Sequence, residues 1–218
     1  MSERMLVIKD VRLELESGWK VVSGPDINDP PPDGYAIVPT PEGLVSYCVG
    51  PAYSGACASL TRQAQPGWNS IALSFEVKPD AAIATHAEVN EFDLRVQLEK
   101  WNYNMSGQLN ITKGGMWQLV NAEEKWVDTD FMPGPFPAGR WTPVRICYEI
   151  DPAAHTFSTT RVIIGDKSYT VPEEFRNVQA SQKDWDDGVA VVQVQIGLNA
   201  QGGGVSHMVK NMTLHWEF

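Results

Sequence analysis

The residues 91–103 combine side chains that could carry acid–base and hydrogen-bonding chemistry. Their sequence, EFDLRVQLEKWNY, alternates polar and apolar residues. Successive side chains of an extended strand point to opposite faces, so the pattern predicts one apolar and one polar face. The predicted polar face holds Glu91, Asp93, Arg95, Gln97, Glu99, Trp101 and Tyr103. Carboxylates, a guanidinium, an amide and aromatic rings line sugar-binding grooves, so the stretch predicts a groove of that kind.

The two carboxylates at the start of this stretch have a spacing that suits glycosidic chemistry. Glu91 and Asp93 are two residues apart, which places their Cβ atoms roughly 6.5–7 Å apart along a strand. Carboxyl groups about 5–10 Å apart act as acid and nucleophile or base in glycoside hydrolysis. A polysaccharide lyase instead needs a cation and a proton carrier, which Arg95, Tyr103 and His215 could supply. The candidate catalytic residues are therefore Glu91, Asp93 and His215.

Other polar alternations supply candidate ligand-binding residues. Residues 192–199 and 211–218 alternate around a glycine-rich turn, and their polar sides offer amide and hydroxyl groups. Aromatic rings outside the apolar pattern are candidates for stacking on a sugar. The predicted ligand-binding set is Arg95, Gln97, Trp101, Tyr103, Trp117, Gln193, Gln195 and Asn211.

Short alternating runs and turn signals extend along most of the chain. Residues 71–77 alternate cleanly, Gly165-Asp166 is a two-residue hairpin signal, and residues 29–34 form a proline-rich loop. No convincing helical period, internal repeat or linker interrupts them. Many antiparallel strands with turns at this spacing predict an all-β sandwich or jelly roll. We expect residues 1–218 to form one domain, since such domains often reach this length.

The composition of the chain limits the classes of partner that it can bind. The formal net charge of −10 disfavours nucleic acid and anionic membrane, because both reward basic patches. An uncharged glycan or another small molecule fits better. Three cysteines cannot all pair, so no disulfide scaffold is predicted. The start of the chain resembles neither a signal peptide nor a membrane span, which predicts a cytoplasmic protein or a secreted one whose leader has been removed. Nothing in the sequence indicates an oligomeric state.

Two acidic runs could ligate a structural calcium ion through carboxylate oxygens. They comprise Asp128 and Asp130, and Asp184, Asp186 and Asp187. Neither run has the spacing of a defined calcium loop, and solvated acidic turns explain both more simply. We therefore expect no metal at the site and no cofactor, with structural calcium as the alternative.

Three segments give the chain a family resemblance. They are the pattern W-x-S-x-x-x-x-F-E-V-K at residues 68–78, the segment G-R-W-T-P-V at residues 139–144, and the closing pair of residues 192–199 and 210–218. Together they resemble the concanavalin A-like lectin/glucanase superfamily. The resemblance implies an antiparallel two-sheet jelly-roll sandwich that holds its ligand in a concave polar groove. It also implies that the polar sides of residues 192–199 and 211–218 lie beside residues 91–103 in that groove.

The glucanases of that superfamily carry E-x-D-x-x-E or E-x-D-x-E, and this chain matches only the first half. The next expected carboxylate falls at Arg95 or Val96. Lyase motifs of the fold are absent as well. The sequence therefore favours a domain that binds a neutral glycan, and leaves open whether it is an enzyme. One alternative is a glycoside hydrolase or polysaccharide lyase. Another is an intracellular enzyme or carrier for a small hydrophobic metabolite, which the many tryptophans would suit.

Overall fold

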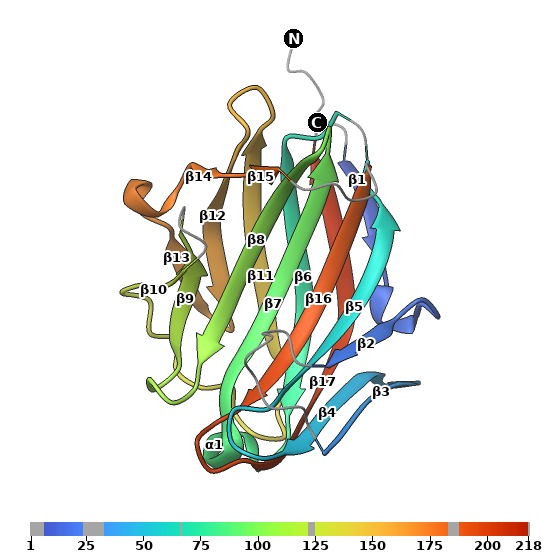
Figure 1. Cartoon of the computed structure of the whole chain (residues 1–218), viewed down its shortest axis with the longest axis vertical. Coiled ribbons are helices and arrows are strands. Elements are labelled where there is room, and N and C mark those ends of the chain that lie inside the picture. Colours follow the sequence, from blue (N-terminus) through green and yellow to red (C-terminus); the bar gives the residue numbers. More distant parts are fainter. Residues whose placement is uncertain (1–6, 24–32, 66, 122–124, 183–187, 218) are drawn as a thin grey trace.

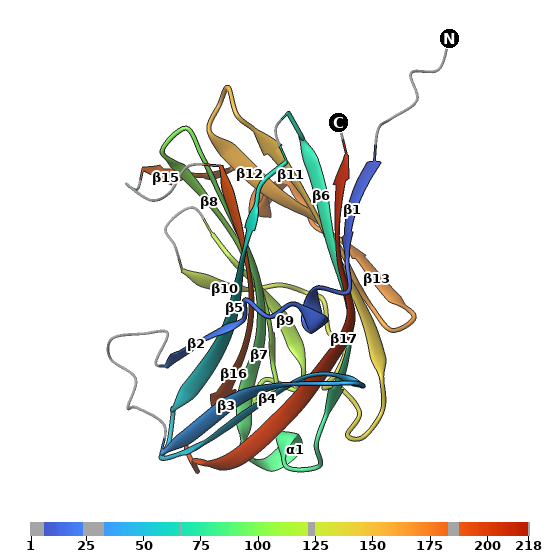
Figure 2. The same cartoon turned by 90° about the vertical axis from the view of Figure 1, so that its right-hand side faces the viewer.

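The computed structural model consists of two antiparallel β-sheets packed face to face (Figures 1 and 2). It describes residues 7–23, 33–65, 67–121, 125–182 and 188–217. We call the sheet nearer the viewer in Figure 1 the front sheet and the other the back sheet. This arrangement confirms the predicted all-β two-sheet sandwich. Within the described residues, no helix is long and apolar enough to cross a membrane.

The front sheet has the order β10-β9-β8-β7-β16-β5-β2, and β15 pairs with β8. Its strands are β2 (Lys20–Ser23), β5 (Gly55–Gln63), β7 (Ala87–Leu98), β8 (Trp101–Asn110), β9 (Met116–Val120), β10 (Trp126–Asp128), β15 (Ser181–Gln182) and β16 (Val189–Leu198).

The back sheet has the order β13-β12-β11-β6-β17-β4-β3, with β1 paired to β17 and β14 to β12. Its strands are β1 (Val7–Val11), β3 (Gly34–Thr40), β4 (Gly43–Gly50), β6 (Ser70–Pro79), β11 (Thr142–Asp151), β12 (Thr156–Ile164), β13 (Lys167–Thr170), β14 (Val178–Gln179) and β17 (Gly203–Glu217). Short helices occupy Leu13–Leu15 (η1), Ile83–His86 (α1) and Glu173–Phe175 (η2).

Residues 91–103 form a hairpin and not the single strand that the alternation predicted. β7 ends at Leu98 and β8 begins at Trp101. Between them, Glu99 and Lys100 both have positive φ, 51° and 67°. Two-residue turns of this kind match the twist of a hairpin, but they usually contain Asn or Gly, and this one has neither. The turn resets the alternation, so residues after it face the opposite way from the prediction.

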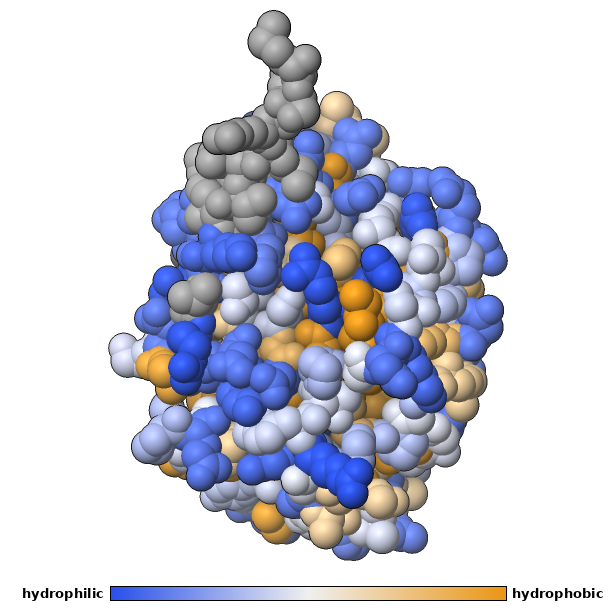
Figure 3. Space-filling view, turned by 180° about the vertical axis from the view of Figure 1, so that it is seen from behind, coloured by the Kyte–Doolittle hydropathy of each residue, from blue (hydrophilic) through white to orange (hydrophobic). Residues whose placement is uncertain are grey.

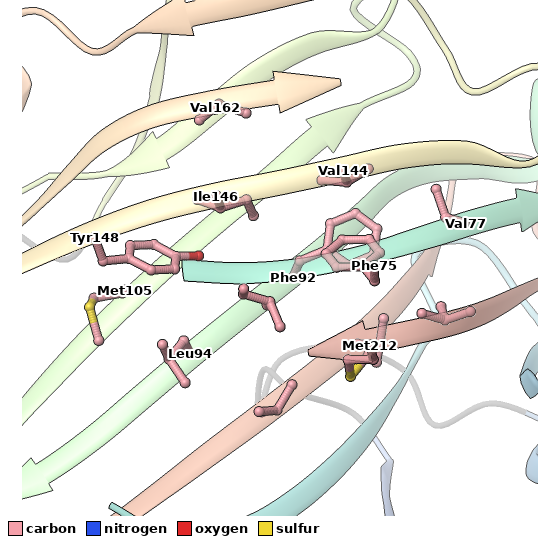
Figure 4. Close-up of a cluster of buried hydrophobic side chains, with 14 of the residues drawn as sticks. Phe75, Val77, Phe92, Leu94, Met105, Val144, Ile146, Tyr148, Val162 and Met212 are labelled. Atoms are coloured by element: carbon pink, nitrogen blue, oxygen red, sulfur yellow. The ribbon is translucent and has the colours of Figure 1, made fainter. Parts of the chain in front are cut away.

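The core lies between the sheets and is formed by the apolar faces of their strands. Phe75 of β6 meets Phe92 of β7 with ring centroids 4.5 Å apart. Around this contact, side chains from β7, β8, β11, β12 and β17 fill the interior (Figure 4). Phe92, Leu94 and Val96 are all buried, as the alternation of residues 91–98 predicted.

A buried carboxylate joins the N-terminal segment to the longest strand. The register of β17 against β6 shifts between Lys210 and Thr213, which leaves backbone N–H groups there without ladder partners. The carboxylate of Glu14 in η1 accepts hydrogen bonds from these N–H groups. Its Oε1 accepts from Asn211 N at 3.0 Å, and its Oε2 accepts from Met212 N at 2.9 Å. Its side chain is fully buried and also contacts Arg12 at 2.6 Å. Glu14 therefore stabilises the irregularity in β17.

We expect Glu14→Ala to lower the free energy of unfolding by about 2–4 kcal/mol, because two buried N–H groups lose charged acceptors. Urea denaturation followed by tryptophan fluorescence measures the change. The control is Glu16→Ala, which removes a partly exposed carboxylate 3.3 Å from Arg62 and should change stability by less than about 1 kcal/mol. Equal effects of the two substitutions would contradict this role for Glu14.

Candidate functional site

Rows of polar side chains cross the outer face of the front sheet, and we call this surface the polar face. Residues directly opposite each other on paired strands point to the same side of a sheet. One row therefore runs across six strands through Cys57, Gln195, Glu91, Gln108, Gln118 and Asp128. The adjacent row contains Ser59, Gln193, Asp93 and Ser106. β7 and β16 lie at the centre of this surface (Figure 1).

Six of the residues predicted from the sequence come together here. They are Glu91, Asp93, Arg95, Gln97, Gln193 and Gln195, on the neighbouring strands β7 and β16. Although they point away from the core, Asp93 and Gln97 are each only 1% exposed. Asp93 Oδ2 lies 3.8 Å from Arg95 Nη2. The centre of the polar face is thus a crowded, partly desolvated surface.

Glu91 and Asp93 form a coupled carboxyl pair. The pKa of Glu91 is raised well above its usual range, first by burial and then by the charge of Asp93 and a hydrogen bond to it. Burial also raises the pKa of Asp93, while Arg95 and hydrogen bonds from Glu91 and Ser106 oppose the rise. This hydrogen bond raises the pKa of Glu91 and lowers that of Asp93, so it favours Glu91 as the carboxyl that holds its proton more strongly.

A hydrogen-bond network extends the polar face toward β10. Gln118 Oε1 accepts from Gln108 Nε2 at 2.6 Å and from Asn110 Nδ2 at 3.2 Å. Gln118 Nε2 donates to Asp128 Oδ1 at 2.5 Å, and Lys113 Nζ lies 2.7 Å from the same oxygen. Hydrogen bonds from Lys113 and Gln118 lower the pKa of Asp128. Gln108 and Gln118 are absent from the site predicted from the sequence, although both occupy polar positions of alternating segments.

Several buried polar atoms of this surface lack a hydrogen-bond partner within the described part of the chain. Three of them are Arg95 Nε, Asn102 Oδ1 and Gln193 Oε1. Leaving such an atom unsatisfied costs about 1–3 kcal/mol. All three lie on the side of the front sheet that faces away from the core. A ligand that displaces the side chains covering them could satisfy them.

Three aromatic residues predicted to stack on a ligand lie off the polar face, so their predicted placement is wrong. Tyr103 pairs with Val96 and is 1% exposed, and Trp117 is fully buried in the core. The ring of Trp117 lies so close to Gly107 that a Cβ on Gly107 would come within 2.5 Å of it.

Trp101 packs against the core at one end of the sandwich, where it stacks on His155 with ring centroids 4.1 Å apart. The Glu99–Lys100 turn reversed the faces assigned to Trp101 and Tyr103.

His215 and Asn211 lie on the opposite side of the molecule from Glu91 and Asp93. Both belong to β17 in the back sheet, because the chain crosses from one sheet to the other between β16 and β17. Asn211 donates to Glu76 Oε1 at 2.6 Å. The pKa of His215 is lowered, first by burial and then by Arg145 and Lys9. The prediction that these residues join the site is therefore wrong. Figure 3 shows their side of the molecule, where hydrophilic residues surround a hydrophobic patch near the centre of the view.

Trp126 is an aromatic residue that the predicted site omitted. It pairs with Val120 and lies two residues from Asp128, so it shares the outer face with Asp128 and Gln118. It is 36% exposed. Trp126 therefore offers an accessible ring at the β10 end of the polar face.

The described residues contain no group of three or more His, Cys, Asp or Glu side chains arranged to hold a metal ion. Of the residues considered for calcium, Asp128 is paired with Lys113 and hydrogen-bonded to Gln118. Asp184, Asp186 and Asp187 lie outside the described residues.

The coupled pair predicts a pH dependence of stability. Because the pKa values of both carboxyls are raised on folding, the folded protein binds more protons than the unfolded chain above the ordinary carboxyl pKa of about 4. The free energy of unfolding should therefore fall as pH rises through this window. Glu91→Gln should show a smaller fall between about pH 4.5 and pH 8 in urea denaturation. Glu149→Gln, at an exposed position of β11, is the control and should follow the wild type. A Glu91→Gln profile parallel to that of the wild type would contradict the coupling.

Known proteins were compared with this chain in sequence and in structure, and only solved structures are similar to it. No protein-family model and no curated protein matches the sequence. Among solved structures, arcelin-5, a lectin-like defense protein from Phaseolus vulgaris, is 11% identical with a TM-score of 0.56 over 97% of this chain and 98% of its own. A Bauhinia forficata lectin in complex with GalNAc is 9% identical with a TM-score of 0.54, covering 99% of both chains. Alginate lyase vAL-1 from Chlorella virus is 11% identical with a TM-score of 0.54, and the match covers 90% of this chain and 92% of its own.

These similarities cover nearly the whole chain at low identity, so they concern the fold and leave the ligand undetermined. They agree with the resemblance found in the sequence. The protein has the concanavalin A-like jelly-roll fold.

Proposed function

We propose that the protein binds a neutral carbohydrate on the polar face of the front sheet. The observation that carries this proposal is the combination of buried, incompletely hydrogen-bonded polar atoms with an accessible tryptophan on one surface. Sugar hydroxyls both donate and accept hydrogen bonds, so they suit the Gln193 carbonyl and the Arg95 guanidinium together. A sugar ring also has an apolar face that could rest on Trp126.

The charges of this surface favour an uncharged ligand. Asp93 and Asp128 are acidic, and each already has a cation beside it, Arg95 and Lys113 respectively. An anionic polysaccharide would therefore meet an acidic surface whose cations are already engaged. A hydrophobic metabolite would leave the polar rows unsatisfied, at a cost of about 1–3 kcal/mol for each buried group. A neutral glycan avoids both penalties.

One observation favours a second candidate function, cleavage of a glycan. Two neighbouring carboxyls, of which Glu91 has the more strongly raised pKa, are the kind of acid–base pair that glycoside hydrolases use. Against cleavage, Glu91 and Asp93 are hydrogen-bonded to each other, and the following polar position of β7 is Arg95 instead of a third acid. The lyase set of Arg95, Tyr103 and His215 is not assembled, since Tyr103 is in the core and His215 is on the back sheet.

We expect Gln195→Ala to weaken the binding of a glycan identified on an array of neutral oligosaccharides by about tenfold, because it removes hydrogen bonds worth about 1–1.5 kcal/mol. Isothermal titration measures the affinity. His215→Ala, on the opposite sheet, is the control and should bind like the wild type.

Product analysis of the same mixtures separates the two candidate functions. A binding protein yields no product, whereas a hydrolase yields product that Glu91→Gln abolishes while binding is retained. Absence of binding to every glycan, or equal losses in Gln195→Ala and His215→Ala, would overturn the proposal.

A further inference from the structure

We infer that a pocket at one end of the front sheet binds a terminal, uncharged sugar residue of the glycan proposed above. The pocket has a volume of about 310 Å³ and lies where the loops β4–β5, β8–β9 and β16–β17 meet the start of β7. Its walls are formed by Tyr53, Glu88, Thr112, Asn199, Ala200 and Gln201. This inference rests on the proposed function, but it concerns a surface outside the polar rows.

Asn199 holds the pocket in shape. Its carbonyl accepts from Tyr53 N at 3.2 Å and from Gly202 N at 3.0 Å, and its backbone N–H donates to His86 O at 2.8 Å. Its side chain donates to Thr85 O at 2.8 Å and accepts from Gln201 N at 2.9 Å. One residue thus connects the β4–β5 loop, the β16–β17 loop and α1. A site ordered before binding loses less conformational entropy when the ligand arrives.

The loops also approach each other closely at Gly202. This residue has a φ of +65°, and a Cβ on it would lie 2.7 Å from Gly50 O. Only glycine fits there without displacing the β4–β5 loop. The contact keeps the loop that carries Tyr53 against the loop that carries Gln201.

Tyr53 has the features of a stacking residue. Its side chain is 53% exposed, and its φ of +62° is unusual for a residue other than glycine. A conformation of this kind costs about 1–3 kcal/mol and persists where the surrounding structure fixes it, often at ligand sites. Here the hydrogen bond from Tyr53 N to Asn199 O supplies part of that constraint. The strained backbone therefore presents an aromatic ring at the pocket.

The other walls determine the class of ligand. Glu88 supplies a carboxylate, Gln201 an amide and Thr112 a hydroxyl, and the set contains no Lys, Arg or His. An acidic sugar would find no cation in this lining. Hydroxyl groups of a neutral sugar can donate to the carboxylate and exchange hydrogen bonds with the amide.

Hydrogen-bonded side chains connect the pocket to the polar face. Thr112 Oγ1 donates to Asn110 Oδ1 at 2.9 Å, and Asn110 Nδ2 donates to Gln118 Oε1 at 3.2 Å. Gln118 belongs to the long polar row, so these hydrogen bonds link that row to the wall of the pocket. An oligosaccharide that follows them from the polar face would place its terminal residue beside Tyr53.

The test uses the full chain and a neutral oligosaccharide series of increasing length, taken from the glycan identified on the array. We expect Gln201→Ala and Tyr53→Gly each to weaken binding of the longest oligosaccharide about fivefold to tenfold in isothermal titration. Glycine at position 53 accepts the positive φ, so Tyr53→Gly removes the ring while the backbone remains unstrained. The control is Tyr47→Ala, which removes a partly exposed tyrosine of β4 in the back sheet and should leave binding unchanged. Thermal unfolding verifies that each variant is folded.

The possible outcomes separate this inference from the proposed function. If the pocket variants bind every oligosaccharide like the wild type while Gln195→Ala weakens binding, the inference is overturned and the proposed function stands. If the wild type binds no glycan, both are overturned. A loss confined to longer oligosaccharides supports a terminal subsite.

Discussion

Each strand of the front sheet must bury one face against the back sheet, and this packing decides which side chains reach the polar face. In β7, Phe92, Leu94 and Val96 point into the core, which leaves Asp93 and Arg95 on the outside. Since the side-chain period of a strand is two, a shift of one residue would exchange the faces. The contact between Phe92 and Phe75 of the back sheet therefore also positions the coupled carboxyls.

The buried polar groups of the polar face lower the stability of the fold, which suggests that the face serves another purpose. Buried carboxyls and amides lose hydration, and only well-placed partners offset the loss. Here burial raises the pKa values of Glu91 and Asp93, and the nearby Arg95 opposes the rise. Gln193 and Asn102 nevertheless keep buried oxygens without a partner in the described chain. Such an arrangement suits a surface organised for a polar ligand better than one organised only for stability.

Much of the fold could be predicted from the sequence, because alternation reports directly on burial. Residues 91–98 show this, and the two-sheet sandwich followed from many segments of that kind. The site was predicted less completely, for two physical reasons. The Glu99–Lys100 turn lacks the usual turn residues, so the faces of Trp101 and Tyr103 were assigned wrongly. Alternation also reveals that a strand has a polar face, but it does not show to which sheet the strand belongs. His215 and Asn211 lie in β17, which belongs to the back sheet.

The most direct test of glycan binding on the polar face is ¹⁹F NMR of protein labelled with 5-fluorotryptophan, titrated with a glycan identified on the array. Trp126→Phe assigns the signal of the accessible ring. The account predicts that the Trp126 signal shifts with saturation, while the signal of Trp117, buried in the core, stays in place. Saturable binding that leaves the Trp126 signal unmoved, or no binding to any glycan, would contradict it.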